Sequence, residues 1–111
     1  MIKRDYIETW SGKELWLPFA DEEAICIEDI AHALCMVPRF AGHIDNFYSV
    51  AEHSINVAKI LPNHLKLQGL LHDATEAYLC DIPTPFKRMI PQYKELEDNL
   101  WATISAKYNV P

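Results

Sequence analysis

Prolines divide the 111-residue chain into short segments, and their spacing leaves room for one helix or one hairpin in each segment. Proline interrupts helices and strand interiors, and it holds the preceding residue in an extended conformation. Pro18 is expected to end a hairpin, Pro38 and Pro62 to end two helices, and Pro91 to occupy the first turn of a last helix. We therefore expect one all-α domain over residues 1–111, with a small N-terminal β-hairpin.

Apolar residues recur at helical spacing in several of these segments. They predict helices over residues 27–34, 49–61, 65–79 and 91–108. Ser49 and Glu52 have the spacing of a capping box before the second helix. Gly69 lies inside the third helix at some cost in stability, which is expected where another helix passes close to it. The residues expected to face the core from this third helix are Leu67, Leu70, Leu71, Ala74 and Tyr78.

The remaining segments carry turn signals. β-Branched and aromatic residues lie on both sides of Ser11 and Gly12, so residues 7–17 are expected to form the hairpin. Residues 39–46 are expected to be a loop. Residues 81–85 are expected to be non-helical, because each of their two prolines favours extended geometry in the residue before it.

Composition and charge argue against several classes of partner. Half of the residues are apolar and 23% are charged, which is typical of a globular domain. The net charge of −6 argues against a duplex nucleic-acid partner, whereas a single nucleotide needs only one or two local cations. No apolar run approaches the roughly 18 residues of a membrane span, and Lys3 and Arg4 stand where a signal peptide needs apolar residues. The three cysteines form no C-x-x-C pair, so we expect reduced thiols in a cytoplasmic protein.

Several residues between positions 53 and 81 have side chains that could build one metal site: His53, His72, Asp73, Glu76 and Asp81. On a helix, His72 and Glu76 are one turn apart. His72 and Asp73 would point about 100° apart, so both can reach one ion only if it sits between them and another helix supplies further ligands. His53 is the natural candidate. Imidazole and carboxylate together suit Mn, Co, Fe, Ni or Zn better than Ca. Taken alone, each residue is more often an ordinary core or surface residue.

Three stretches around these residues resemble one known superfamily. They are YSVAEHS at residues 48–54, LLHDATEA at residues 70–77 and DIPTPFK at residues 81–87. Their residues and spacing closely resemble the motifs of the HD superfamily of metal-dependent phosphohydrolases. The match looks nearest to its 5′-deoxynucleotidase-like branch, which includes phage deoxynucleotide phosphohydrolases. The resemblance covers residues 10–108, nearly the whole chain, and it implies an HD-domain helical bundle.

The resemblance implies a role for each matching residue of the metal site. His53, His72 and Asp73 would hold one divalent ion, with Mn, Co, Zn, Ni, Fe and Mg as the candidates. Glu76 would be the catalytic carboxylate that orients or deprotonates the attacking water. Asp81 would lie at the pocket rim and contact the substrate or assist proton transfer. The plainer alternatives are a solvated helix residue for Glu76 and a turn residue for Asp81.

Arg39 and Phe40 match an Arg-aromatic pair of the same family. The resemblance implies that Arg39 binds the substrate phosphate, a role for which the planar guanidinium is suited. Phe40 would lie near the sugar or the base. A surface cation and a core-packing ring are the alternatives for these two residues.

One ligand of the family has no counterpart in this sequence. Family members carry a further metal-binding Asp on a helix well downstream of the His-Asp doublet, and this sequence reaches Pro111 before such a helix. The late acidic residues Glu95, Glu97 and Asp98 lie on the preceding helix and are not assigned the role. We expect a C-terminally short HD domain, either a truncated form or a natural three-ligand variant. Its uncovered apolar surface would favour a homo-oligomer.

The leading expectation is hydrolysis of a nucleotide phosphate ester or anhydride, with a deoxynucleotide as the best substrate, by metal-activated water. The alternative is a catalytically weak or inactive HD module that binds metal or nucleotide, because the distal Asp is absent. A third reading is a structural or partner-binding remnant of the fold. The sequence leaves open the base, the number of phosphates and the ion.

Overall fold

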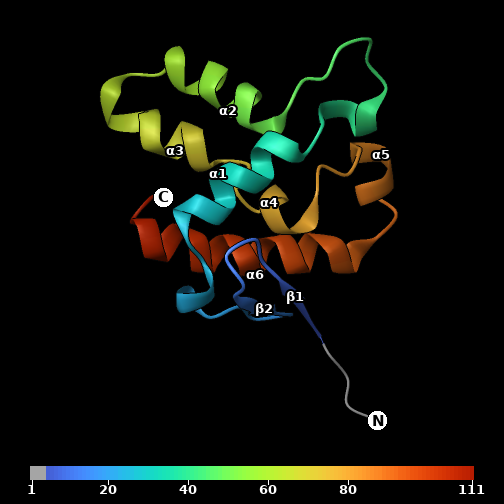
Figure 1. Ribbon diagram of the computed structural model, residues 1–111, viewed down its shortest axis with the longest axis vertical. Helices are drawn as coiled ribbons and strands as arrows, with labels where there is room; N and C mark the ends of the chain where they lie inside the picture. Colours follow the sequence, from blue (N-terminus) through green and yellow to red (C-terminus); the bar gives the residue numbers. More distant parts are fainter. Residues whose placement is uncertain (1–4) are drawn as a thin grey trace.

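The computed structural model describes residues 5–111, so Lys3, Arg4 and the argument on a signal peptide lie outside the described residues. In Figure 1, α2 and α3 form the top of the molecule, α6 runs across its lower half, and α1 and α4 lie between these two layers. The hairpin of β1 and β2 reaches below α6. The elements in chain order are β1 (Tyr6–Glu8), β2 (Glu14–Trp16), η1 (Glu22–Ala24), α1 (Ile27–Met36), η2 (Arg39–Gly42), α2 (Val50–Lys59), η3 (Asn63–Leu65), α3 (Lys66–Leu71), α4 (Glu76–Leu79), α5 (Thr84–Lys87) and α6 (Pro91–Tyr108).

The hairpin predicted for residues 7–17 is confirmed. β1 and β2 pair antiparallel, with Ile7 opposite Leu15. Gly12 lies in the connecting turn with φ +89°, a conformation that other residues rarely adopt. The turn is fastened to α1, because the backbone N–H and the hydroxyl of Ser11 donate to the two carboxylate oxygens of Asp29 at 2.8 and 2.7 Å. The hairpin therefore reaches the core through Leu15, which is fully buried.

The helices predicted for residues 27–34, 49–61 and 91–108 are confirmed as α1, α2 and α6, with small differences at their ends. The capping box is partly formed, since the Ser49 hydroxyl accepts a hydrogen bond from the Glu52 backbone N–H at 3.0 Å. Pro91 stands in the first turn of α6, where its missing N–H leaves no hydrogen bond unmade.

The single helix predicted for residues 65–79 is wrong. The chain forms α3, then a turn at residues 72–75, then α4. Hydrogen bonds to the third preceding residue replace the α-helical ladder there, with Ala74 N–H on the Leu71 carbonyl and Glu76 N–H on the Asp73 carbonyl, both at 2.9 Å. Such bonds tighten and redirect the chain, so the helical period of the sequence does not continue through the turn.

The predicted inward face of this segment is partly wrong. Leu71 and Ala74 are buried, at 2% and 0% exposed, but Leu67 and Leu70 are 47% and 39% exposed. α3 packs on α2 through Gly69, and this leaves Leu67 and Leu70 turned outward.

Residues 81–85 also differ from the prediction at their end. Thr84 and Pro85 begin the short helix α5. Proline fits the first turn of a helix, because the N–H groups there have no partner within the helix.

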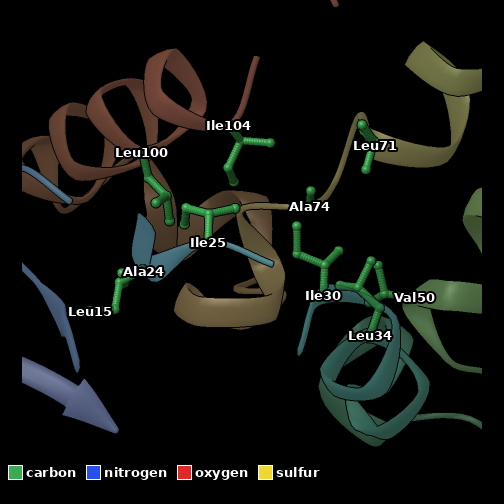
Figure 2. Close-up of a cluster of buried hydrophobic side chains, with 10 residues drawn as sticks. All are labelled: Leu15, Ala24, Ile25, Ile30, Leu34, Val50, Leu71, Ala74, Leu100 and Ile104. Carbon is green, nitrogen blue, oxygen red and sulfur yellow. The ribbon is translucent and has the colours of Figure 1, made fainter. Parts of the chain in front are cut away.

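The core lies between α6 on one side and α1 and α2 on the other (Figure 2). α6 contributes Leu100 and Ile104, as its apolar stripe predicts, and both are at most 1% exposed. The remaining buried residues of the cluster come from the hairpin, the segment before α1, and α1 to α4: Leu15, Ala24, Ile25, Ile30, Leu34, Val50, Leu71 and Ala74. Because Leu71 precedes the turn at residues 72–75 and Ala74 lies within it, core packing fixes the position of that turn.

Two further features bear on the expected partners. Among residues 5–111, no helix combines the length and the apolar character needed to cross a bilayer. A hollow of about 290 Å³ between α1, α2 and α3 is lined by apolar side chains. Ile27 and Ile55 at this hollow are 44% and 47% exposed. This hollow does not test whether a missing C-terminal helix leaves apolar surface uncovered, and the homo-oligomer stays a prediction.

Replacing Ser49 by Ala removes the acceptor for the Glu52 N–H and should lower the free energy of unfolding by about 1 kcal/mol. In a domain of this size the melting temperature should fall by about 4–8 °C, measured by calorimetry. Ser49→Thr keeps a hydroxyl and serves as the control. Equal melting temperatures of the Ala variant and the wild type would show that the cap contributes nothing.

Candidate metal centre

Three candidate ligands come together from separate elements. His53 lies on α2, His72 follows α3, and Asp73 lies in the turn before α4. The Asp73 Oδ2 atom is 3.0 Å from His72 Nε2 and 3.5 Å from His53 Nε2. His72 and Asp73 both lie in the turn after α3, where the α-helical path has ended. Their side chains can therefore face the same point.

The donor set fits a divalent ion of the first transition row. One ligand atom from each of these residues can be chosen so that all lie within 4.8 Å of one another, and the two imidazole rings are 5.4 Å apart between centroids. Donors about 2.0–2.2 Å from a shared ion stand about 2.8–3.6 Å apart in tetrahedral or octahedral geometry. Small side-chain rotations would therefore suffice to hold an ion. All three side chains are partly exposed, so further positions around the ion would face solvent or substrate.

The charges of the three groups are arranged around Asp73. Burial opposes its charge, but hydrogen bonding from His72 and Glu76 and the nearby imidazoles lower the pKa of Asp73 overall. The hydrogen bond to Asp73 raises the pKa of His72. Burial and the nearby Arg39 charge lower the pKa of His53, so its imidazole is neutral at pH 7 and has a lone pair for a metal.

Glu76 is the first residue of α4 and is only 4% exposed. Burial, together with the neighbouring carboxyls of Asp73 and Asp81, raises the pKa of Glu76 to about 10. Its Oε1 atom is buried and has no hydrogen-bond partner among residues 5–111. The side chain therefore belongs to the polar cluster and not to a solvated helix surface, in contrast to the plainer alternative.

Arg39 and Asp81 form an ion pair beside this cluster, with Nη1 donating to Oδ2 at 3.0 Å. The Arg39 Nε atom is buried without a partner in the described part of the chain. The loop that carries Arg39 is tied to the start of α2, because the Arg39 N–H donates to the Tyr48 carbonyl and the Val50 N–H to the Val37 carbonyl, at 2.8 and 2.9 Å. The same anchorage places the guanidinium near the helix that carries His53.

Residues 39–46 begin with the 3₁₀ turn η2, where Phe40 and Ala41 adopt left-handed φ values of 57° and 53°. The Phe40 ring is 57% exposed, so it does not pack in the core. The Arg39 guanidinium carbon lies 5.0 Å from the centroid of this ring, within the range of a cation–π contact.

The structure thus brings together six of the predicted site residues, His53, His72, Asp73, Glu76, Asp81 and Arg39, with Phe40 attached through Arg39. Sequence reasoning missed a hollow of about 250 Å³ beside His72 and Asp73, which Lys87 and Trp101 also line. The only signal for Lys87 was its place directly after the DIPTPF stretch. Glu97, which was not assigned a metal role, pairs with Lys87 at 3.2 Å.

Comparison with known proteins gives relatives whose names state no activity. No family model matches the chain. It is 43% identical over 106 residues to the uncharacterized protein YfdR of Escherichia coli K12, a match that covers 96% of this chain and 60% of YfdR. It is 38% identical over 120 residues to an uncharacterized protein of Rhodobacter capsulatus, covering 99% of this chain and 61% of that protein. The chain therefore spans less than two thirds of the length of these curated relatives.

Glu76→Gln should stabilise the metal-free protein more at pH 8 than at pH 5. The pKa of Glu76 is raised in the folded state, so its favourable contribution at low pH is lost as the pH rises above the unfolded value of about 4.3. Gln cannot ionise and avoids this loss. The difference in melting temperature between variant and wild type, measured with chelator, should grow by about 4 °C or more between the two pH values.

The lowered pKa of Asp73 does not interfere with this test, because its contribution is lost only when the pH falls below the unfolded value of about 3.9. Glu95→Gln, at an exposed position of α6, is the matched control. A Glu76→Gln difference that is the same at both pH values would contradict the buried, protonated carboxyl.

Proposed function

We propose that this protein is a metal-dependent phosphohydrolase that acts on nucleotides in the cytoplasm. The convergence of His53, His72 and Asp73, with ligand atoms within 4.8 Å of one another, is the observation that carries the proposal. The resemblance of the surrounding sequence to HD-domain phosphohydrolases supports the same chemistry. It also favours a deoxynucleotide as the substrate and one divalent ion, such as Mn, Co, Zn, Ni, Fe or Mg, as the cofactor.

A divalent ion, when bound, lowers the pKa of a coordinated water and withdraws charge from phosphoryl oxygens. Arg39 is suited to the substrate phosphate, because its planar guanidinium carries further N–H donors besides the Nη1 that donates to Asp81. Glu76 is suited to exchange a proton with the attacking water, since its carboxyl adjoins Asp73 and holds a proton in the metal-free protein. Asp81 orients Arg39 and shares the carboxyl cluster.

A second candidate is an HD module that binds metal or nucleotide without turnover. The observation that favours it is the small ligand set. Within residues 5–111, three His and Asp side chains come together as candidate metal ligands, without a further Asp. Catalytic sites with three protein ligands exist, and the remaining positions are then filled by water and substrate. A three-ligand set therefore allows either function, and turnover separates them.

Asp73→Ala should weaken binding of Mn²⁺ or Co²⁺ more than about 100-fold and abolish phosphate release from deoxynucleotides, because it removes the carboxylate shared by both imidazoles. Metal binding is measured by calorimetry and phosphate release on a panel of nucleoside mono-, di- and triphosphates. Glu95→Ala is the control, since Glu95 is exposed on α6 and does not line the hollow beside Asp73. Metal binding without turnover in the wild type would favour the binding module, and no metal binding would reject both candidates.

Arg39→Lys should raise KM for the best nucleotide about tenfold, equivalent to about 1.4 kcal/mol, with a smaller change in kcat. Lysine keeps the charge but loses the planar set of donors that can grip a phosphate while Nη1 stays on Asp81. Arg88→Lys, at an exposed position after α5, is the matched control. An unchanged KM would remove Arg39 from the phosphate-binding role.

A further inference from the structure

Gly69 lies where α3 passes closest to α2. A Cβ atom built on Gly69 would stand 2.6 Å from the Leu61 Cδ1 atom and 3.4 Å from the Ala58 Cα atom. Real Cβ atoms essentially never come within 3.0 Å of another heavy atom, so a side chain here would have to displace its neighbours. The Leu61 side chain can rotate away, but the Ala58 Cα is a backbone atom and can move only if α2 moves. The spacing of the two helices therefore depends on the missing side chain.

This close approach is about one helical turn from the proposed metal ligands. α2 and α3 run in opposite directions through the connection at residues 60–65 (Figure 1). Ala58 and Gly69 contact each other near this connection. His53 lies farther from it on α2, and His72 directly follows the end of α3. A change in helix spacing at Gly69 must therefore change the distance between the two imidazoles, whose ring centroids are now 5.4 Å apart.

Gly69 acts on the same centre through its carbonyl. The His72 Nδ1 atom lies 2.6 Å from the Gly69 oxygen, and because a carbonyl only accepts, Nδ1 carries the hydrogen. This bond fixes the rotation of the imidazole, and Nε2 then lies 3.0 Å from Asp73 Oδ2. Hydrogen bonds of this kind to the second nitrogen of a metal-binding histidine orient the ring and set its tautomer.

We infer that Gly69 is a positioning residue of the metal centre. Its missing side chain sets the α2–α3 spacing that brings His53 to His72, and its carbonyl holds the His72 ring with Nε2 toward Asp73. This inference rests on the proposed function, because it concerns the same ligands.

The test compares Co²⁺ binding by the wild-type chain, Gly69→Ala and Gly69→Ala/Leu61→Ala, by calorimetry and by the visible absorption of Co²⁺. Gly69→Ala should bind Co²⁺ about 10–100-fold more weakly, the range found for groups that orient metal ligands. The double variant should recover most of the affinity, because the atom nearest to the new Cβ is then gone. Leu61→Ala and Leu67→Ala are the controls, and both should bind Co²⁺ as the wild type does. Leu67 is exposed and lies on α3, the helix that carries Gly69.

A second measurement separates positioning from stability. A purely structural role predicts a lower melting temperature of the metal-free variant, because the new Cβ must displace Leu61, together with unchanged affinity for Co²⁺. The ring nitrogen shifts of His72, measured by NMR without metal, should change in Gly69→Ala and return toward the wild-type values in the double variant. This readout also serves if Gly69→Ala alone folds poorly, because the double variant relieves the contact with Leu61.

The outcomes distinguish this inference from the proposed function. If the wild type binds no Co²⁺, the proposed metal centre fails, and the His72 shifts still test whether Gly69 positions the ring. If the wild type binds Co²⁺ and Gly69→Ala keeps both the affinity and the His72 shifts, the positioning role is overturned. If the double variant binds Co²⁺ as weakly as Gly69→Ala, the contact with Leu61 does not cause the loss of affinity. The role of Gly69 in setting the helix spacing is then overturned.

Discussion

The turn at residues 72–75 determines where the polar groups of the candidate metal centre point. On a continuous helix, His72 and Asp73 would diverge by about 100°. The hydrogen bonds of this turn instead redirect the chain, so that both side chains face His53 and Glu76 starts the next helix inside the cluster. Leu71 and Ala74, which flank and enter the turn, are buried in the core. Core packing and ligand geometry are thus one constraint, and neither can change without the other.

The carboxyls of Asp73, Glu76 and Asp81 share a small volume with few positive charges. Asp81 has Arg39 at 3.0 Å and Asp73 has the two imidazoles, whereas Glu76 is buried between them and keeps its proton. Like charges brought close together in a buried place favour such a division, because one of them stays neutral. A bound divalent cation would change this balance more than any side chain present. The electrostatics therefore agree with the proposal of a metal centre.

Local patterns predicted the parts of the fold that local forces decide. The apolar period predicted α1, α2 and α6, and the cap at Ser49 and the close helix contact at Gly69 were both foreseeable. The break after α3 was not, because neither Gly nor Pro marks it and the helical period runs on through it; packing of the core decides it. Likewise, the candidate ligand residues could be singled out by residue type and spacing, but the pairing of Arg39 with Asp81, 42 positions apart, depends on tertiary contacts.

The left-handed backbone at Phe40 and Ala41 has a consequence for how the protein can change. Side chains with a Cβ are held there at a cost of roughly 1–2 kcal/mol each, and the anchorage on α2 maintains the arrangement. Glycine at either position would remove that cost but would widen the range of shapes open to the segment. Relief of backbone strain and a fixed orientation of the Arg39 guanidinium therefore place opposite demands on the residues of this short segment.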